Sequence, residues 1–96
     1  MKVVIHAADA PSLARARSNA RNLRIEATDA EIEVVGNADA VAAALEAPDE
    51  TDSYLVLCSN TLRRLGLEPR EGLVRVPAAI SHLARRQEEG WAYIRA

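Results

Sequence analysis

Short apolar runs alternate with segments of helical period along the whole chain. The runs are rich in β-branched residues and are bounded by turn or capping residues, as buried strands are. The segments between them place apolar residues three or four positions apart, as amphipathic helices do. The strands are predicted at residues 2–6, 30–36, 54–57, 73–76 and 91–94. The helices are predicted at residues 11–27, 38–47, 62–65 and 78–89.

The predicted helices carry start and stop signals. Asp9 is a helix-capping residue, and Pro11 suits the first turn because its missing N–H would have no partner there. Gly66 and Gly90 are expected to end the helices before them. The acidic stretch at residues 49–53 is predicted to be a surface loop.

This alternation of strands and helices predicts one α/β domain over residues 1–96. We expect a three-layer α/β/α fold of Rossmann-like or flavodoxin-like type, with a five-stranded parallel sheet and right-handed crossovers. In such sheets, sites form at the carboxyl ends of the strands. The residues at those ends are His6, Asn37, Cys58 and Pro77.

Composition narrows the classes of function. The formal net charge of −2 gives no electrostatic basis for binding nucleic acid or an anionic membrane. No run approaches the roughly 18 apolar residues of a membrane span. The first residues also lack the pattern of a signal peptide, so a cytoplasmic protein is expected.

Cofactors and metals are not expected. The loop after the first strand reads AADAP and lacks the glycines of a nucleotide-binding turn. One cysteine excludes an internal disulfide, and its spacing from the two histidines makes no zinc signature.

Cys58 is the candidate reactive group. It ends the third predicted strand and is followed by Ser59, Asn60 and Thr61, which can all cap a helix N-terminus. The partial positive charge at such an N-terminus stabilises a thiolate. The alternative is a buried structural thiol, which is the commoner role of a free cysteine.

Other polar residues at the strand ends could complete an anion-binding site. His6 would lie near Cys58 if the first and third strands are neighbours, and it is otherwise a half-exposed hydrogen-bonded residue. Asn60 and Thr61 either cap the helix or bind an anion together with its free N–H groups. Asn37 lies at the end of the second strand. His82, away from any strand end, is expected at the surface or at an interface.

Three sequence motifs resemble those of the DsrE/DsrF-like family, in particular its small YchN-like branch. A Cys-x-Asn-Thr-Leu motif with a following glycine occupies Cys58, Asn60, Thr61, Leu62 and Gly66. A Leu-x-x-x-Gln-x-x-Gly-aromatic-x-Tyr-Ile pattern occupies Leu83, Gln87, Gly90, Trp91, Tyr93 and Ile94. An Asn-x-x-Asn-Leu stretch occupies Asn19, Asn22 and Leu23.

The resemblance implies a DsrE-type parallel sheet and a cytoplasmic homotrimer or homohexamer. It also implies a sulfur relay, in which Cys58 carries sulfane sulfur as a persulfide and passes it to a partner thiol. Sulfur donor and acceptor proteins would then be partners. Two alternatives stay open: an oligomeric module that binds a small anion or metabolite and has a structural Cys58, and a redox-sensing thiol. The chain departs from the family in its short second helix region, residues 37–48.

Overall fold

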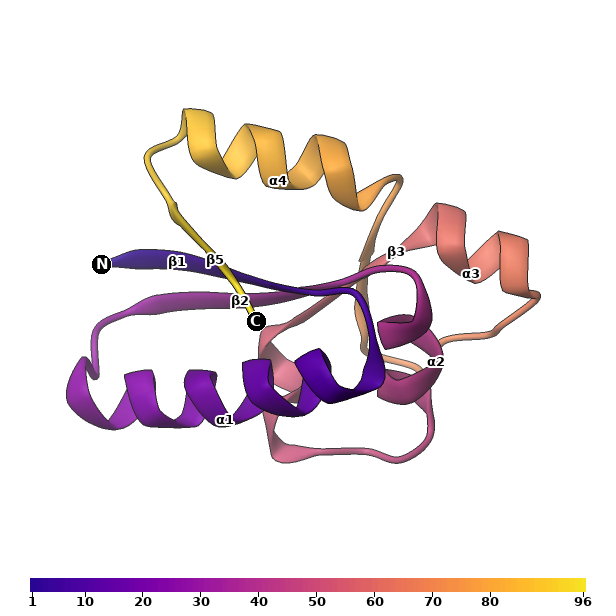
Figure 1. Cartoon of the computed structure of the whole chain (residues 1–96), viewed down its shortest axis with the longest axis horizontal. Coiled ribbons are helices and arrows are strands. Elements are labelled where there is room, and N and C mark those ends of the chain that lie inside the picture. The colour runs from indigo at the N-terminus through magenta and orange to yellow at the C-terminus, as the bar shows by residue number, and fades with distance from the viewer.

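The computed structural model describes residues 1–96 and shows a five-stranded parallel sheet between helices (Figure 1). The strands are β1 (Lys2–Ala7), β2 (Glu31–Gly36), β3 (Leu55–Cys58), β4 (Val74–Val76) and β5 (Ala92–Arg95). The helices are α1 (Ala10–Glu26), α2 (Asp39–Leu45), the 3-10 helix η1 (Glu50–Tyr54), α3 (Ser59–Leu65) and α4 (Ala79–Glu88). The predicted fold class, a three-layer α/β/α arrangement, is confirmed. No helix has the length and apolar character needed to cross a membrane.

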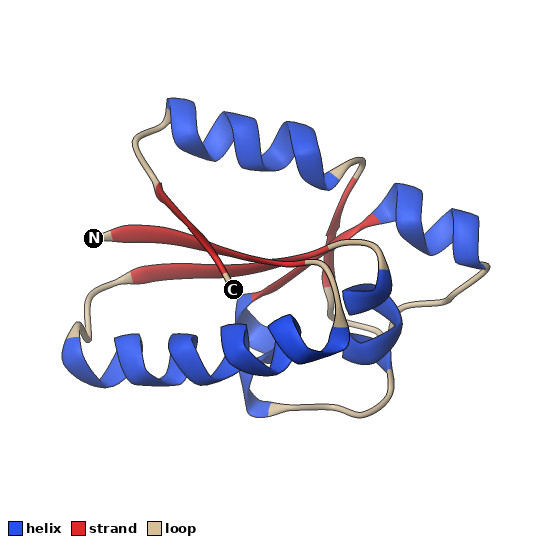
Figure 2. Cartoon of the chain, in the orientation of Figure 1, coloured by secondary structure: helices blue, strands red, loops and turns tan.

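The strand order is β4-β3-β2-β1-β5, and every pairing is parallel. The chain therefore adds strands outward from β1 to β4 and then crosses back to the free side of β1. This return crossing places α4 on the opposite face of the sheet from α1 and α2 (Figure 2). The reversal is the Rossmann-like feature of the fold.

Two predictions about local structure are wrong, one about a loop and one about the start of a helix. Residues 49–53 are not a plain loop, because Glu50–Tyr54 forms a 3-10 helix. The Asp49 carboxylate accepts hydrogen bonds from the amide and hydroxyl of Thr51, and this local capping winds the segment into a turn. The third helix begins at Ser59 rather than Leu62, since β3 runs directly into it with Cys58 as the N-cap residue.

The predicted start of the first helix is correct. The Asp9 carboxylate accepts a hydrogen bond from the Ser12 amide at 2.8 Å. The Ser12 hydroxyl in turn accepts one from the Asp9 amide at 3.1 Å, which completes a capping box. These bonds to Ser12 lower the pKa of the Asp9 carboxyl. The first strand therefore passes into α1 through a short, well-defined turn.

The two faces of the sheet are covered unequally. A cluster of 15 buried apolar residues lies on the side of α1 and α2, and a cluster of 6 lies on the side of α4. The buried helix positions on the first side are mostly alanine, for example Ala16, Ala20, Ala40 and Ala44. Small side chains let these helices lie close to the valines and leucines of the sheet, so the chain needs no phenylalanine.

Helix α4 is held to the sheet by a half-buried ionic contact as well as by packing. Glu33 of β2 accepts a hydrogen bond from His82 Nε2 at 2.7 Å and two from Arg86 at 2.7 and 3.0 Å. The Arg86 guanidinium also lies 4.5 Å from the centre of the Trp91 ring. His82 was expected at the surface or at an interface; it is not on the open surface, because the bond to Glu33 holds its side chain at 14% exposure, and the interface position stays a prediction.

We expect Glu33→Gln to lower the free energy of unfolding by about 2 kcal/mol at neutral pH, the usual range for hydrogen bonds to charged groups. Burial raises the pKa of Glu33, but the bonds from Arg86 and His82 outweigh it and the pKa is lowered. The stabilisation is thus complete above the pKa of an unfolded glutamate and is lost as the pH falls through the folded pKa. Urea unfolding followed by Trp91 fluorescence should show the two proteins converging in acid.

Glu31→Gln is the matched control for this prediction. Glu31 lies two residues earlier on the same strand, is exposed, and meets only Lys2 Nζ at 3.9 Å. Its loss should change stability little, because exposed ion pairs contribute little. Equal losses in the two variants would contradict the anchoring role of Glu33.

The turn after β2 contains a strained residue. Ala38 has φ of 49° and ψ of −136°, a combination that residues with a Cβ atom rarely adopt. The Ala38 amide donates to the Thr61 hydroxyl at 3.3 Å, which ties this turn to α3. Glycine would adopt the same conformation without strain.

Ala38→Gly is therefore expected to raise the free energy of unfolding by about 1 kcal/mol. Relief of ~1–3 kcal/mol of strain outweighs the entropy of a glycine in the unfolded chain, which is ~0.5–1 kcal/mol. The same substitution at Ala42, an exposed position inside α2, should instead cost about 1 kcal/mol. Thermal unfolding of both variants checks the opposite signs, and a loss of stability in Ala38→Gly would contradict the prediction.

Candidate functional site

The candidate site lies where the connections after β3 and β4 leave toward opposite faces of the sheet. Leu62 of α3 belongs to the apolar cluster on the α1 side. Ala79 and Leu83 of α4 belong to the cluster on the other side. Diverging connections at the carboxyl ends of adjacent strands are where open α/β sheets form sites. Cys58 is the last residue of β3 and pairs with Val76, the last residue of β4.

The sulfur of Cys58 takes the place of a helix cap. Its side chain faces α4, and the residue is 5% exposed. Ala78, the N-cap residue of α4, makes no side-chain cap hydrogen bond. The amide of Ala79, the first residue of that helix, instead donates to Cys58 Sγ at 3.4 Å. The free thiol thus satisfies one of the N–H groups that a helix start leaves without a partner.

These surroundings favour the thiolate. Burial raises the pKa of the Cys58 thiol, but the Ala79 amide and the amide and hydroxyl of Thr61 outweigh it. The pKa is lowered as a result. The Asn60 amide, which donates to the Pro77 carbonyl at 3.2 Å, also lowers the pKa. The anion is therefore stabilised by neutral donors and without a basic side chain.

The predicted capping residues have other roles. Ser59, Asn60 and Thr61 form the first turn of α3 and do not cap it. The Asn60 side-chain carbonyl accepts a hydrogen bond from Arg63 and is exposed. Thr61 is 6% exposed, and its hydroxyl accepts a hydrogen bond from the Ala38 amide of the β2–α2 turn. Of the three residues, Thr61 is the one whose side chain lowers the pKa of Cys58.

His6 does not lie on a strand next to Cys58. The condition for that contact was adjacency of the first and third strands, but β2 lies between β1 and β3. The His6 ring instead bonds on both sides, with Nε2 2.9 Å from Asn37 Oδ1 and Nδ1 2.8 Å from the Tyr93 hydroxyl. Asn37 and Cys58 each directly follow a residue of the last β2–β3 pair, Gly36 and Leu57.

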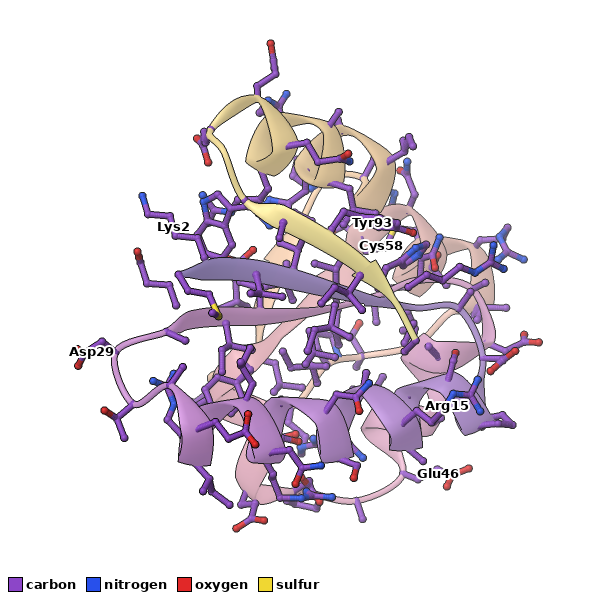
Figure 3. The ribbon with its side chains drawn as sticks, turned by 60° about the vertical axis from the view of Figure 1, so that its left-hand side comes forward. Lys2, Arg15, Asp29, Glu46, Cys58 and Tyr93 are labelled. Atoms are coloured by element: carbon purple, nitrogen blue, oxygen red, sulfur yellow. The ribbon has the colours of Figure 1, made fainter.

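Tyr93 is the site residue that sequence reasoning missed. In the sequence, Tyr93 stands out only as part of a patterned C-terminus. Its hydrogen-bond partner, His6, lies 87 residues away in the chain. Register places it beside Val4, whose side chain faces α4, so Tyr93 faces the same way. Figure 3 shows the labelled Tyr93 and Cys58 on the side of the sheet that α4 covers.

No hollow opens on Cys58. A hollow of about 600 Å³ lies at the amino ends of the strands, where Lys2, Glu33, Arg86 and Trp91 are among its lining residues. A second, of about 510 Å³, lies beside α3 and is lined in part by Ser59, Arg63 and Arg75. No group of three or more histidine, cysteine, aspartate or glutamate side chains could hold a metal ion.

The fold and the carboxyl edge of the sheet define a small α/β protein with one thiol. This thiol lies where the connections after β3 and β4 leave toward opposite faces of the sheet. Among solved structures, the chain is similar to MTH1491 from Methanobacterium thermoautotrophicum, described as a protein of unknown function. The two are 33% identical, the match covers 99% of this chain and 98% of that chain, and the TM-score is 0.83. The chain belongs to the same family as MTH1491. No model of a known protein family matches the chain, and no curated protein matches it either.

The alkylation rate of Cys58 should rise with pH around a pKa below that of a free thiol, because its donors favour the anion. Thr61→Val removes the hydroxyl donor and should raise this pKa. Ser59→Ala, a change at the preceding residue, should leave it where it is. The measurement is the rate of iodoacetamide labelling against pH, and an unchanged profile in Thr61→Val would contradict the role given to Thr61.

Proposed function

We propose that this protein is a sulfur-relay carrier in which Cys58 holds sulfane sulfur as a persulfide and passes it to a partner thiol. The observation that carries the proposal is the hydrogen bond from the Ala79 amide to Cys58 Sγ, with the Thr61 donors beside it. The resemblance of the Cys-Ser-Asn-Thr-Leu segment to the DsrE/DsrF-like family supports the same chemistry.

The transfer needs no oxidant or cofactor. The Cys58 thiolate attacks the outer sulfur of a donor persulfide, the sulfur–sulfur bond of the donor breaks, and the donor leaves as a thiolate. The sulfur and its proton then reside on Cys58. In the second step an acceptor thiolate attacks that outer sulfur, and Cys58 leaves as a thiolate.

The donors around Sγ suit both steps. A lowered pKa increases the fraction of thiolate available for the first attack. It also makes Cys58 a better leaving group in the second step, because thiols of lower pKa leave faster. The same hydrogen bonds therefore assist loading and release.

A carrier of this kind works with partner proteins, and we propose a cytoplasmic homotrimer or homohexamer that meets a sulfur donor and an acceptor. Exposed apolar side chains support association, with Val74 56% exposed and Ile80 76% exposed near the two ends of the β4–α4 connection. A net charge of −2 supports neither a nucleic acid nor an anionic membrane as partner.

The competing function is a non-catalytic module that binds a small anion, with Cys58 as a structural thiol. The hollow beside α3 favours it, because Arg63 and Arg75 lie on its wall and Cys58 does not. Under this function Cys58→Ala would leave anion binding and assembly intact, whereas Arg75→Ala would weaken binding.

The test of sulfur transfer is intact-mass analysis after exposure to polysulfide or to a persulfidated protein donor. We expect the wild type to gain the mass of one sulfur atom and to lose it when an acceptor thiol is added. Cys58→Ser, which removes the sole cysteine, should gain nothing. A wild-type protein that stays unmodified with both donors would overturn the proposal.

A further inference from the structure

Strand β5 lies at one edge of the sheet and is bare on both of its faces. Its four residues, Ala92–Arg95, are all exposed, although the strands of parallel sheets are normally covered on both faces. Tyr93 is 40% exposed on the α4 side. Ile94 pairs with Ile5 of the α1-side cluster and is 45% exposed on that side. Figure 3 shows β5, the yellow strand, between α4 and α1 with neither helix over it.

The two helices leave β5 uncovered because polar contacts hold them over the other strands. Arg24 of α1 donates to the hydroxyl of Tyr54 at 3.1 Å, which keeps α1 beside the segment that leads into β3. Glu33 of β2 accepts hydrogen bonds from His82 and Arg86, which keep α4 over β2. Both helices are thus fixed away from the β5 edge.

The outer edge of β5 carries backbone groups that have no partner in the chain. In a parallel ladder, every second residue turns its N–H and C=O toward the same neighbouring strand. The Ala96 amide donates to the His6 carbonyl at 2.9 Å, so Ala96 and the residues two and four positions before it face β1. The backbone groups of Tyr93 and Arg95 therefore point outward. Such an edge is a template for the addition of another strand.

The flank of α4 that borders β5 is uncharged. Helical period places Ile80, Ala84 and Gln87 on the flank opposite the ionic contact with β2, and all three are exposed. Ile80 is 76% exposed. Charged residues are depleted and tyrosine is enriched at the centres of protein interfaces, which is the composition of this flank together with Tyr93.

We propose that β5 pairs with the β5 of a second copy of this chain, antiparallel about a two-fold axis at Ile94, so that the two sheets become one. A second copy fits this edge because a two-fold contact is self-complementary. The outward N–H and C=O of Tyr93 on each chain would bond with those of Arg95 on the other chain. The contact involves neither Cys58 nor its surroundings, so it does not depend on the sulfur relay.

The axis is placed at Ile94 because the neighbouring positions are less favourable. An axis at Arg95 would set two guanidinium groups directly opposite each other, and like charges in this position destabilise a sheet. An axis at Tyr93 would pair Arg95 with Trp91, whose amide already donates to the Arg86 carbonyl. An axis at Ile94 uses residues of β5 alone and covers two exposed isoleucine side chains with each other.

The size of the contact requires more than the strand. A standard interface takes ~800 Å² from each partner. The exposed surface of the chain is 5499 Å², so such an interface would use about one-seventh of it. Four residues are too few for this area, and the uncharged flank of α4 supplies the nearest additional surface. Of the two assemblies proposed above, the homohexamer can contain a two-fold axis, whereas a homotrimer cannot.

The first test is the molar mass in solution, measured by light scattering during size-exclusion chromatography. We expect the wild type to contain an even number of chains. Ile94→Lys sets two lysines opposite each other at the axis and should halve the mass. Ile25→Lys is the matched control, because Ile25 is 77% exposed and helical period places it on the outer side of α1, opposite the buried Ala16. It should leave the mass unchanged.

The second test is a cross-link at the axis, which also decides the matter if Ile94→Lys does not fold. Ile94→Cys is made in a Cys58→Ser background and oxidised with oxidised glutathione. Facing residues of a non-hydrogen-bonded antiparallel pair have Cα atoms ~4.5 Å apart, which lies within the range for a disulfide. We expect a covalent dimer on a non-reducing gel. Ile25→Cys in the same background should stay a single chain.

The outcomes separate this inference from the proposed function. A wild type that is monomeric or trimeric would overturn the inference and leave the sulfur relay standing. An even-numbered assembly that ignores Ile94→Lys and forms no cross-link through Ile94→Cys would also overturn it. A protein that is halved by Ile94→Lys and takes up no sulfur would support the inference and overturn the relay.

Discussion

The contact between the start of α4 and the end of β3 is the interaction on which the rest of the structure depends. Ala79 donates to Cys58 Sγ, and Asn60 donates to the Pro77 carbonyl, so the β3–α3 and β4–α4 junctions are bonded to each other. From this point α4 crosses back over the sheet and delivers β5 to the far side of β1. Glu33 fixes the other end of the same helix. The return crossing is thus held at both ends by polar contacts, with few apolar residues between.

The same contact explains how a buried thiol can have a lowered pKa. Removing a sulfur from water disfavours its charged form, and most buried cysteines are inert for that reason. Here the missing water is replaced by N–H and O–H donors that the fold must satisfy in any case. As a thiol, Cys58 caps α4, and as a thiolate it receives the same bonds more strongly. The same donors therefore serve both the thiol and the thiolate of Cys58.

The strands and helices could be predicted well from the sequence, but which of them lie next to one another could not. Period and capping signals located the five strands and the four α-helices because those signals are local, and the Asp9 cap is an example. The position of His6 relative to Cys58 could not be read in this way, because it depends on strand order, which no local pattern encodes. For the same reason α4 was not recognised as the source of the main donor to Cys58. Tyr93 stands 87 residues from the histidine it orients.

The polar groups of the candidate site share the less covered face of the sheet. The α1 and α2 side buries a large cluster and closes over the strands, whereas α4 alone covers the other side. Cys58 faces α4 at the carboxyl edge, and the hydrogen-bonded side chains of His6 and Tyr93 lie on the same face of the sheet. Tyr93 is 40% exposed, whereas Cys58 is 5% exposed. The thiol is therefore shielded from bulk solvent by the helix that it caps, while the tyrosine hydroxyl on the same face of the sheet is held by His6 nearer the surface.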